Sequence, residues 1–136
     1  MIIRQLTEQI AVADQLELHD FDAVKAAGFQ SVICNRPDDE GEPHAESRDV
    51  EKLAASLGME FRYLPVNAAQ ITDDDVKQHA QFLSELPMPI LTYCRSGTRC
   101  ARLWALAEAG KQEANDLMEA VEKAGLSIAD MAPRLK

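Results

Sequence analysis

The sequence lacks any membrane-spanning segment, because no run approaches the roughly 18 consecutive apolar residues that such a helix needs. We also expect no signal peptide, since the residues MIIRQLTEQI contain no long apolar core. Cysteine is scarce, and its odd number, 3, is typical of reduced thiols rather than of a disulfide framework. These absences predict a cytoplasmic protein without a membrane partner.

Positive charge is scarce as well. The 136 residues include 14 Lys and Arg against 23 Asp and Glu, which gives a net charge of −9. Such a balance argues against nucleic acid or an anionic membrane as the main partner. The three histidines, His19, His44 and His79, are scattered without metal-ligand spacing, so we expect no metal site and no cofactor.

One segment lacks acidic residues altogether. From Leu86 to Ala107 there is no Asp or Glu, although the chain as a whole is strongly acidic. This segment contains the sequence YCRSGTRC at residues 93–100, in which Cys94 is followed by Arg95, Ser96, Gly97, Thr98, Arg99 and Cys100. A thiol inside a basic loop indicates chemistry on an anion.

Strand and helix patterns alternate along the chain, without repeats, low-complexity tracts or an obvious linker. The strand candidates are Ala11–Ala13, Phe29–Cys34, Met59–Leu64 and Pro89–Tyr93. The helix candidates are His19–Gly28, Val50–Leu57, a helix capped by Thr72 with Val76, Ala80 and Leu83 facing inward, Ala101–Ala109 and Asn115–Ala124. We therefore predict a single α/β domain over residues 1–136, with a mostly parallel central sheet flanked by helices.

Cys94 falls where a predicted strand ends and a helix is about to begin. In parallel sheets, ligands bind at the carboxyl ends of the strands. A loop that turns its N–H groups inward before a helix forms a nest for anions, and Gly97 permits the backbone conformation that such a turn needs. A thiol in this nest has a depressed pKa and is therefore a nucleophilic thiolate at neutral pH.

The loop from Cys94 to Arg99 resembles the active-site loops of two superfamilies, which differ in the spacing between Cys and Arg. Protein tyrosine and dual-specificity phosphatases place five residues between Cys and Arg, whereas rhodanese-type sulfurtransferases have a four-residue loop, as here. The stretches AAGFQSVICNRPDDEGE and YLPVNAAQITDDDVKQHAQFLSELPMPILTYCRSGTRCARLWALA are similar to the phosphatase-like domain of the beta-lactamase hydrolase-like proteins. The resemblance implies a dual-specificity-phosphatase-like fold with the Cys94 loop as its active-site loop. Fused relatives carry a persulfide dioxygenase domain, which implies sulfide or persulfide metabolism.

Three features depart from the phosphatase pattern. Tyr93 stands where those enzymes usually have His, and Arg99 comes one residue early. The region where a general-acid Asp is expected, LPVNAAQ at residues 64–70, contains no carboxylate. Asp73–Asp75 are the nearest candidates, but acids at a helix N-terminus are better explained by the helix dipole.

These departures favour a sulfurtransferase over a phosphatase. In this hypothesis Cys94 takes the outer sulfur of thiosulfate or a persulfide and passes it to a thiol such as glutathione, while Arg99 stabilises the leaving group. Arg95, Ser96, Gly97 and Thr98 would bind the anionic donor.

Two alternatives remain open. One is a cysteine-dependent phosphatase that acts on a phosphate ester. The other is a non-catalytic anion-binding or redox-sensing module in which Cys100 is the redox partner of Cys94. Asn35 and Arg36 follow a predicted strand, and they line the same pocket or form a surface turn. Cys34 is expected in the core, and no oligomeric state follows from the sequence.

Overall fold

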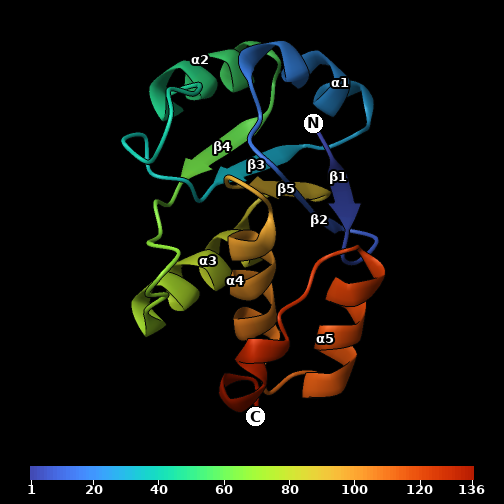
Figure 1. Cartoon of the computed structure of the whole chain (residues 1–136). Coiled ribbons are helices and arrows are strands. Elements are labelled where there is room, and N and C mark those ends of the chain that lie inside the picture. The colour runs from blue at the N-terminus through green and yellow to red at the C-terminus, as the bar shows by residue number, and fades with distance from the viewer.

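A computed structural model describes all residues, 1–136, and contains a five-stranded sheet with the order β1-β2-β5-β3-β4 (Figure 1). Strands β2, β5, β3 and β4 are parallel, and β1 pairs antiparallel with β2 at one edge. The strands are β1 Ile3–Gln5, β2 Ile10–Ala13, β3 Ser31–Cys34, β4 Glu60–Tyr63 and β5 Ile90–Tyr93. The predicted α/β fold with a mostly parallel sheet is confirmed.

Helices cover both faces of this sheet (Figure 1). Two lie on one face, α1 (Phe21–Ala26) and α2 (Ser47–Ser56). The other face carries α3 (Asp73–Glu85), α4 (Thr98–Glu108) and α5 (Ala114–Lys123). Every predicted helix is present, with ends that differ by a few residues. None of them has the length and apolar character needed to cross a membrane.

Two hydrophobic cores fill the space between the helices and the sheet. Successive strand residues point to opposite faces, so Val12, Ile33 and Ile90 join one core. Their neighbours Ala11, Val32 and Leu91 join the other. All positions of β2, β3 and β5 are buried, as expected for parallel strands covered on both faces.

Strand β1 is absent from the sequence-based prediction. It has only three residues and a half-exposed, polar sequence, IRQ, so it shows neither the apolar run nor the alternation on which a strand prediction depends. Its position as an antiparallel edge strand is set by pairing with β2, which is a tertiary contact.

The parallel strands end in register. Tyr93 of β5 lies opposite both Ala13 of β2 and Cys34 of β3, and Cys34 in turn lies opposite Tyr63 of β4. The residues that follow these ends therefore meet at one edge of the sheet, and this alignment brings Asn35 next to Cys94.

Helix α3 begins with a capping box in which Thr72 and Asp75 exchange side chain-to-backbone hydrogen bonds. The predicted inward face is only partly correct, because Leu83 is buried while Val76 is half-buried. The most buried side chain of the helix is instead His79, whose two ring nitrogens have no hydrogen-bond partner.

His79 should make the protein sensitive to acid. Burial lowers the pKa of His79 from 6.5 to about 4 in the folded state. The unfolded chain therefore binds a proton between these pH values that the folded chain does not, so the free energy of unfolding falls as pH falls from 6.5 to 4, by roughly 3 kcal/mol. We expect His79→Leu to lose this part of the pH dependence in urea unfolding at pH 7 and pH 4.5.

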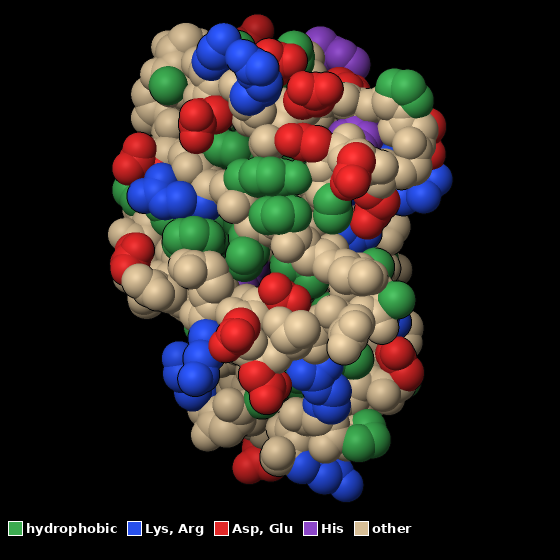
Figure 2. Space-filling view, turned by 90° about the vertical axis from the view of Figure 1, so that its left-hand side faces the viewer, with side chains coloured by type: hydrophobic (Ala, Val, Ile, Leu, Met, Phe, Trp, Pro, Cys, Tyr) green, Lys and Arg blue, Asp and Glu red, His purple; other side chains and the backbone are tan.

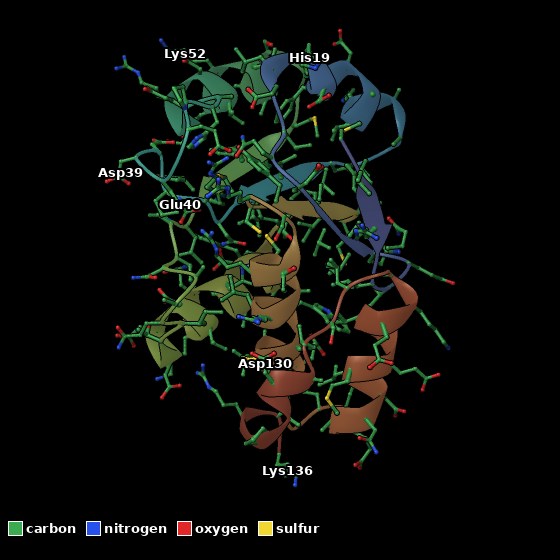
Figure 3. All side chains as sticks on the ribbon, in the orientation of Figure 1. His19, Asp39, Glu40, Lys52, Asp130 and Lys136 are labelled. Carbon is green, nitrogen blue, oxygen red and sulfur yellow. The ribbon has the colours of Figure 1, made fainter.

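His19→Gln is the control for this prediction, because His19 is exposed at the outer end of the molecule (Figure 3). Equal pH dependence of unfolding in wild type and His79→Leu would show that His79 does not contribute.

The segment from Pro37 to His44 forms an acidic loop beside the open edge strand β4. The Tyr63 hydroxyl accepts a hydrogen bond from the Asp38 N–H at 2.9 Å, and the Asp38 carboxylate accepts two from Ser47 at the start of α2. Figure 2 shows this side of the molecule, where a band of hydrophobic side chains lies between charged ones. The start of the acidic loop is thus held against β4 and α2.

Candidate active site

Cys94 lies in a cradle of backbone N–H groups between β5 and α4. The Gly97 N–H donates to Cys94 Sγ at 3.1 Å, and the N–H groups of Ser96 and Cys100 lie close enough to help lower the pKa of Cys94. Gly97 has a φ of 95°, in the left-handed region where a side chain is strained, and this turn directs the N–H groups inward. Backbone N–H groups turned inward in this way have the geometry of an anion nest.

The three cysteines differ sharply in acidity. The Cys100 thiol, followed by the N–H groups of the cradle, lowers the pKa of Cys94 to about 6 against the opposing effect of burial. Burial raises the pKa of Cys34 to about 11 and that of Cys100 well above its ordinary value. At pH 7 about nine-tenths of Cys94 is therefore thiolate, while the other two cysteines are neutral. Cys34 is buried in the core, as expected.

The Cys100 thiol has one proton and two acceptors within reach. It contacts Cys94 Sγ, and it donates to Asn35 Oδ1 at 3.2 Å. A thiolate is the stronger acceptor, so the bond to Cys94 prevails whenever Cys94 is ionised. All three cysteines are free thiols in this structure, and a Cys94–Cys100 disulfide stays a prediction.

Removal of the Cys100 thiol should raise the apparent pKa of Cys94 by about 1 or more, because the thiolate loses its side-chain donor. We expect the midpoint of the iodoacetamide alkylation rate against pH to move upward from about 6 in Cys100→Ala. Cys100→Ser, with a stronger donor, should keep the midpoint at or below the wild-type value. An unchanged midpoint in Cys100→Ala would assign the low pKa to the backbone alone.

Arg99 is buried beside this cradle in the first turn of α4. Its Nη1 donates to the backbone oxygens of Asn35 and Val66, at 3.1 and 2.9 Å. Its Nη2 donates to Glu40 Oε1 at 2.7 Å, whereas its Nε has no partner. The guanidinium is therefore fixed by three contacts, and its Nε remains available to an anion.

The other predicted site residues lie at different depths in the protein. Arg36 is almost fully buried, which excludes the surface-turn alternative, and it donates to Gln15 Oε1 and to the backbone oxygen of Glu40. Arg95 points outward and pairs with Glu42 at 2.7 Å. Ser96 and Thr98 contact each other through their hydroxyls at the rim of the loop.

The sequence left Asn35 open, as a pocket residue or part of a surface turn, and it missed one contributor to the site. Asn35 uses every polar atom it has, because its N–H donates to Tyr93, its side-chain amide donates to the backbone oxygen of Leu64, and its two oxygens accept from Arg99 and Cys100. The missed contributor is Glu40, which the acidic loop brings to Arg99. Both follow β3, and only the place of β3 next to β5 in the sheet decides between the two alternatives for Asn35 and indicates Glu40.

The acids considered as a possible phosphatase general acid, Asp73–Asp75, lie in the first turn of α3. Asp73 is fully exposed and pairs with Arg134, and Asp75 belongs to the capping box of α3. Their place in the first turn of α3 agrees with the explanation by the helix dipole.

No hollow of the surface opens onto Cys94. The largest, of about 630 Å³, is lined by Gly110–Ala114, Asp116, Leu135 and Lys136. Cys94 itself is only 1% exposed. The cradle is thus a small site whose approach is covered, and the acidic loop is the segment whose carboxylates bind the arginines around it.

A parallel sheet with a cysteine cradle between a central strand and a helix defines the class of cysteine-phosphatase-like α/β proteins. Residues 2–111 match the family described as "Beta-lactamase hydrolase-like protein, phosphatase-like domain". The chain belongs to this family.

Known relatives agree with this assignment. A Beta-lactamase hydrolase-like protein from Agrobacterium fabrum is 34% identical over 116 residues, which make up 83% of this chain and 27% of that protein. The chain thus spans about a quarter of the length of the curated relatives it matches.

Solved structures show the same fold. A protein from Neisseria meningitidis Z2491, described as a candidate phosphatase, has a TM-score of 0.89 and 30% identity, and the match covers 100% of this chain and 97% of that one. The core catalytic domain of a PP-IP phosphatase from S. cerevisiae, in complex with citrate, has a TM-score of 0.74 at 12% identity, with coverage of 99% and 83%.

Proposed function

We propose that the protein is a cysteine-dependent phosphatase with Cys94 as its nucleophile. The observation that carries this proposal is the Cys94 thiolate, with a pKa of about 6, inside a cradle of N–H donors beside the buried guanidinium of Arg99. Such a cradle binds the oxygens of a phosphoryl group, and its donors stabilise the charge that these oxygens carry in the transition state. The phosphatase-like family and the candidate phosphatase from Neisseria support the same reaction class.

The reaction proceeds in two displacements. The Cys94 thiolate attacks phosphorus, the bond between phosphorus and the leaving oxygen breaks, and that oxygen departs with the electron pair. Water then attacks the phosphocysteine, the S–P bond breaks, and inorganic phosphate and the thiolate are released. The N–H groups of Ser96, Gly97 and Cys100 and the free Nε of Arg99 bind the phosphoryl oxygens in both steps.

The leaving group determines which substrates fit. The Glu40 carboxylate forms an ion pair with Arg99 and is not free to act as a general acid. Residues 64–70 contain no carboxyl group that could protonate a departing alkoxide. General acid catalysis contributes about 10²- to 10⁴-fold. We therefore expect aryl phosphates and phosphoanhydrides, whose leaving groups are stable anions, to be better substrates than alkyl phosphates.

Sulfur transfer is the second candidate, favoured by the four-residue spacing between Cys94 and Arg99 and by the same missing acid. Cys94 would attack the outer sulfur of thiosulfate, release sulfite and carry that sulfur as a persulfide to a thiol such as glutathione. Sulfite and thiols leave as stable anions, so this reaction needs no acid either.

Parallel assays separate the two candidates. Purified protein is supplied with p-nitrophenyl phosphate, and separately with thiosulfate and glutathione, at pH 6 to 8. Phosphatase function predicts turnover of the ester that exceeds sulfur transfer by at least tenfold. The reverse ratio would assign the site to sulfur transfer, and no turnover of either substrate would favour an anion-binding or redox-sensing module.

A further inference from the structure

Beyond the cradle, five side chains form a chain of alternating charge, which we call the charge ladder: Arg99, Glu40, Arg36, Glu42 and Arg95. Glu40 Oε1 lies 2.7 Å from Arg99 Nη2 and 3.7 Å from Arg36 Nε. Glu42 binds at the other side of Arg36, with Oε1 at 3.7 Å from Arg36 Nη2 and Oε2 at 2.7 Å from Arg95 Nη2. The ladder leads from the cradle to the exposed end of the acidic loop.

Arg36 is the unusual member, because its buried charge has two carboxylates within ion-pair range but no hydrogen bond to either. Its side chain is 1% exposed, yet both neighbouring carboxylates stay 3.7 Å away. Its Nε has no hydrogen-bond partner, and its other bonds go to the neutral oxygens of Gln15 and of the Glu40 backbone. A buried guanidinium is normally paired with an anion at hydrogen-bond distance. An anion closer to Arg36 would therefore be stabilised.

Glu42 differs from Glu40 in how firmly it is held. The Glu42 and Arg95 side chains are 61% and 54% exposed, and exposed ion pairs contribute little to stability. The backbone N–H of Glu42 and then the Arg95 guanidinium lower the pKa of Glu42, so the carboxylate is ionised. The position of this carboxylate is open to water, so a dissolved anion can compete with it for the two guanidinium groups.

The backbone beside this position also fits closely. A Cβ on Gly41, which has a φ of 73°, would lie 3.1 Å from Arg36 Nη2 and 3.2 Å from Arg95 Nη1. Glycine therefore lets the loop approach both guanidinium groups and place Glu42 between them. The Glu42 carboxylate thus has one guanidinium group at each of its oxygens, and guanidinium groups suit carboxylate and phosphate oxygens alike.

We propose that the place of the Glu42 carboxylate, between Arg36 and Arg95, is a second anion subsite, which accepts a second anionic group of the ligand whose phosphoryl group binds in the Cys94 cradle. This inference rests on the proposed function for the role of the cradle. The ligand class is a small phosphoanhydride or phosphate ester with a further phosphate or carboxylate. In the unliganded protein the Glu42 carboxylate binds Arg36 and Arg95 in place of that second group.

Binding of inorganic anions tests the subsite without any turnover. In the Cys94→Ser protein, calorimetry should show that pyrophosphate binds at least tenfold more tightly than orthophosphate. Glu42→Gln should tighten pyrophosphate about threefold to tenfold, because one competing charge is lost, with a smaller change for orthophosphate. Arg95→Gln should remove most of the preference for pyrophosphate.

The acidic loop and the surface offer matched controls. Asp39→Asn removes an acid from the same loop, but Asp39 lies at the outer edge of the loop while Glu40 lies nearer the strand ends (Figure 3). Arg48→Gln removes an exposed arginine of α2. Both should leave the ratio of the two affinities unchanged.

Three outcomes would overturn the subsite: equal affinities for the two anions, no measurable binding of millimolar pyrophosphate, or equal effects of Glu42→Gln and Asp39→Asn. Each is distinguishable from a failure of the phosphatase proposal, which appears as absent turnover of p-nitrophenyl phosphate by the wild-type protein. Calorimetry would still detect the second subsite in that case.

Discussion

Cys94→Ser should abolish phosphatase turnover, with a loss of kcat of about 10⁴-fold or more. A serine hydroxyl in the same cradle stays protonated at neutral pH, and neither a histidine nor a free carboxylate contacts this position to act as a base. The measurement is the steady-state rate with p-nitrophenyl phosphate. Contaminating phosphatases are excluded by preparing the variant in parallel with the wild type.

The same variant should remain folded, because serine and cysteine are close in size and the Gly97 N–H can donate to oxygen as it does to sulfur. We expect its free energy of unfolding to stay within about 1 kcal/mol of wild type. Cys34→Ser is the matched control, since Cys34 is buried with a raised pKa and should leave kcat largely unaffected. Wild-type turnover by Cys94→Ser would refute the assignment of the nucleophile.

Arg99→Lys should lower kcat/KM by about 10²- to 10³-fold although the charge is kept. The guanidinium reaches two backbone oxygens with Nη1 and Glu40 with Nη2 while its Nε is still free, and an ammonium group cannot make all of these contacts together. The lysine ammonium group would pair with the Glu40 carboxylate, and the phosphoryl oxygens would then lack a fixed donor. The rates are compared at equal concentrations of folded protein.

Stability should fall with the same substitution. The backbone oxygens of Asn35 and Val66 lose their buried charged donor, which costs about 1 to 3 kcal/mol. Arg102→Lys, in the same helix but paired with Asp130 nearer the surface, should change neither rate nor stability. If Arg99→Lys kept the wild-type kcat/KM, the fixed orientation of the Arg99 guanidinium would have no part in catalysis.

The sequence indicates most of the fold because its signals are local. Gly58 ends one helix, Thr72 begins another, and the apolar run Pro89–Tyr93 reads as a buried strand. Strand β1 carries no such signal, because a polar tripeptide becomes a strand only through its partner β2. The helix periodicity also missed His79, since its burial follows from packing rather than from hydrophobicity.

The candidate site likewise combines residues of one local segment with residues that only the tertiary fold brings near. Cys94 and Arg99 lie in one continuous segment, and the backbone cradle follows from Gly97 before a helix. Asn35 and Glu40, by contrast, lie more than fifty residues earlier in the chain, and they reach Cys100 and Arg99 only because β3 and β5 are neighbours that end in register. The preference for sulfur transfer rested on loop length and a missing acid, whereas family and fold support the phosphatase alternative.

The central claim is that Cys94 carries a phosphoryl group during turnover, and trapping that group tests it most directly. The protein is mixed with excess p-nitrophenyl phosphate, quenched within the first turnover, and mapped by peptide mass spectrometry under conditions that preserve phosphocysteine. We expect one phosphoryl group on the peptide that contains Cys94, and none in Cys94→Ser. Ester hydrolysis with no phosphoryl group on Cys94, or a Cys94 persulfide formed from thiosulfate without any phosphocysteine, would contradict the account.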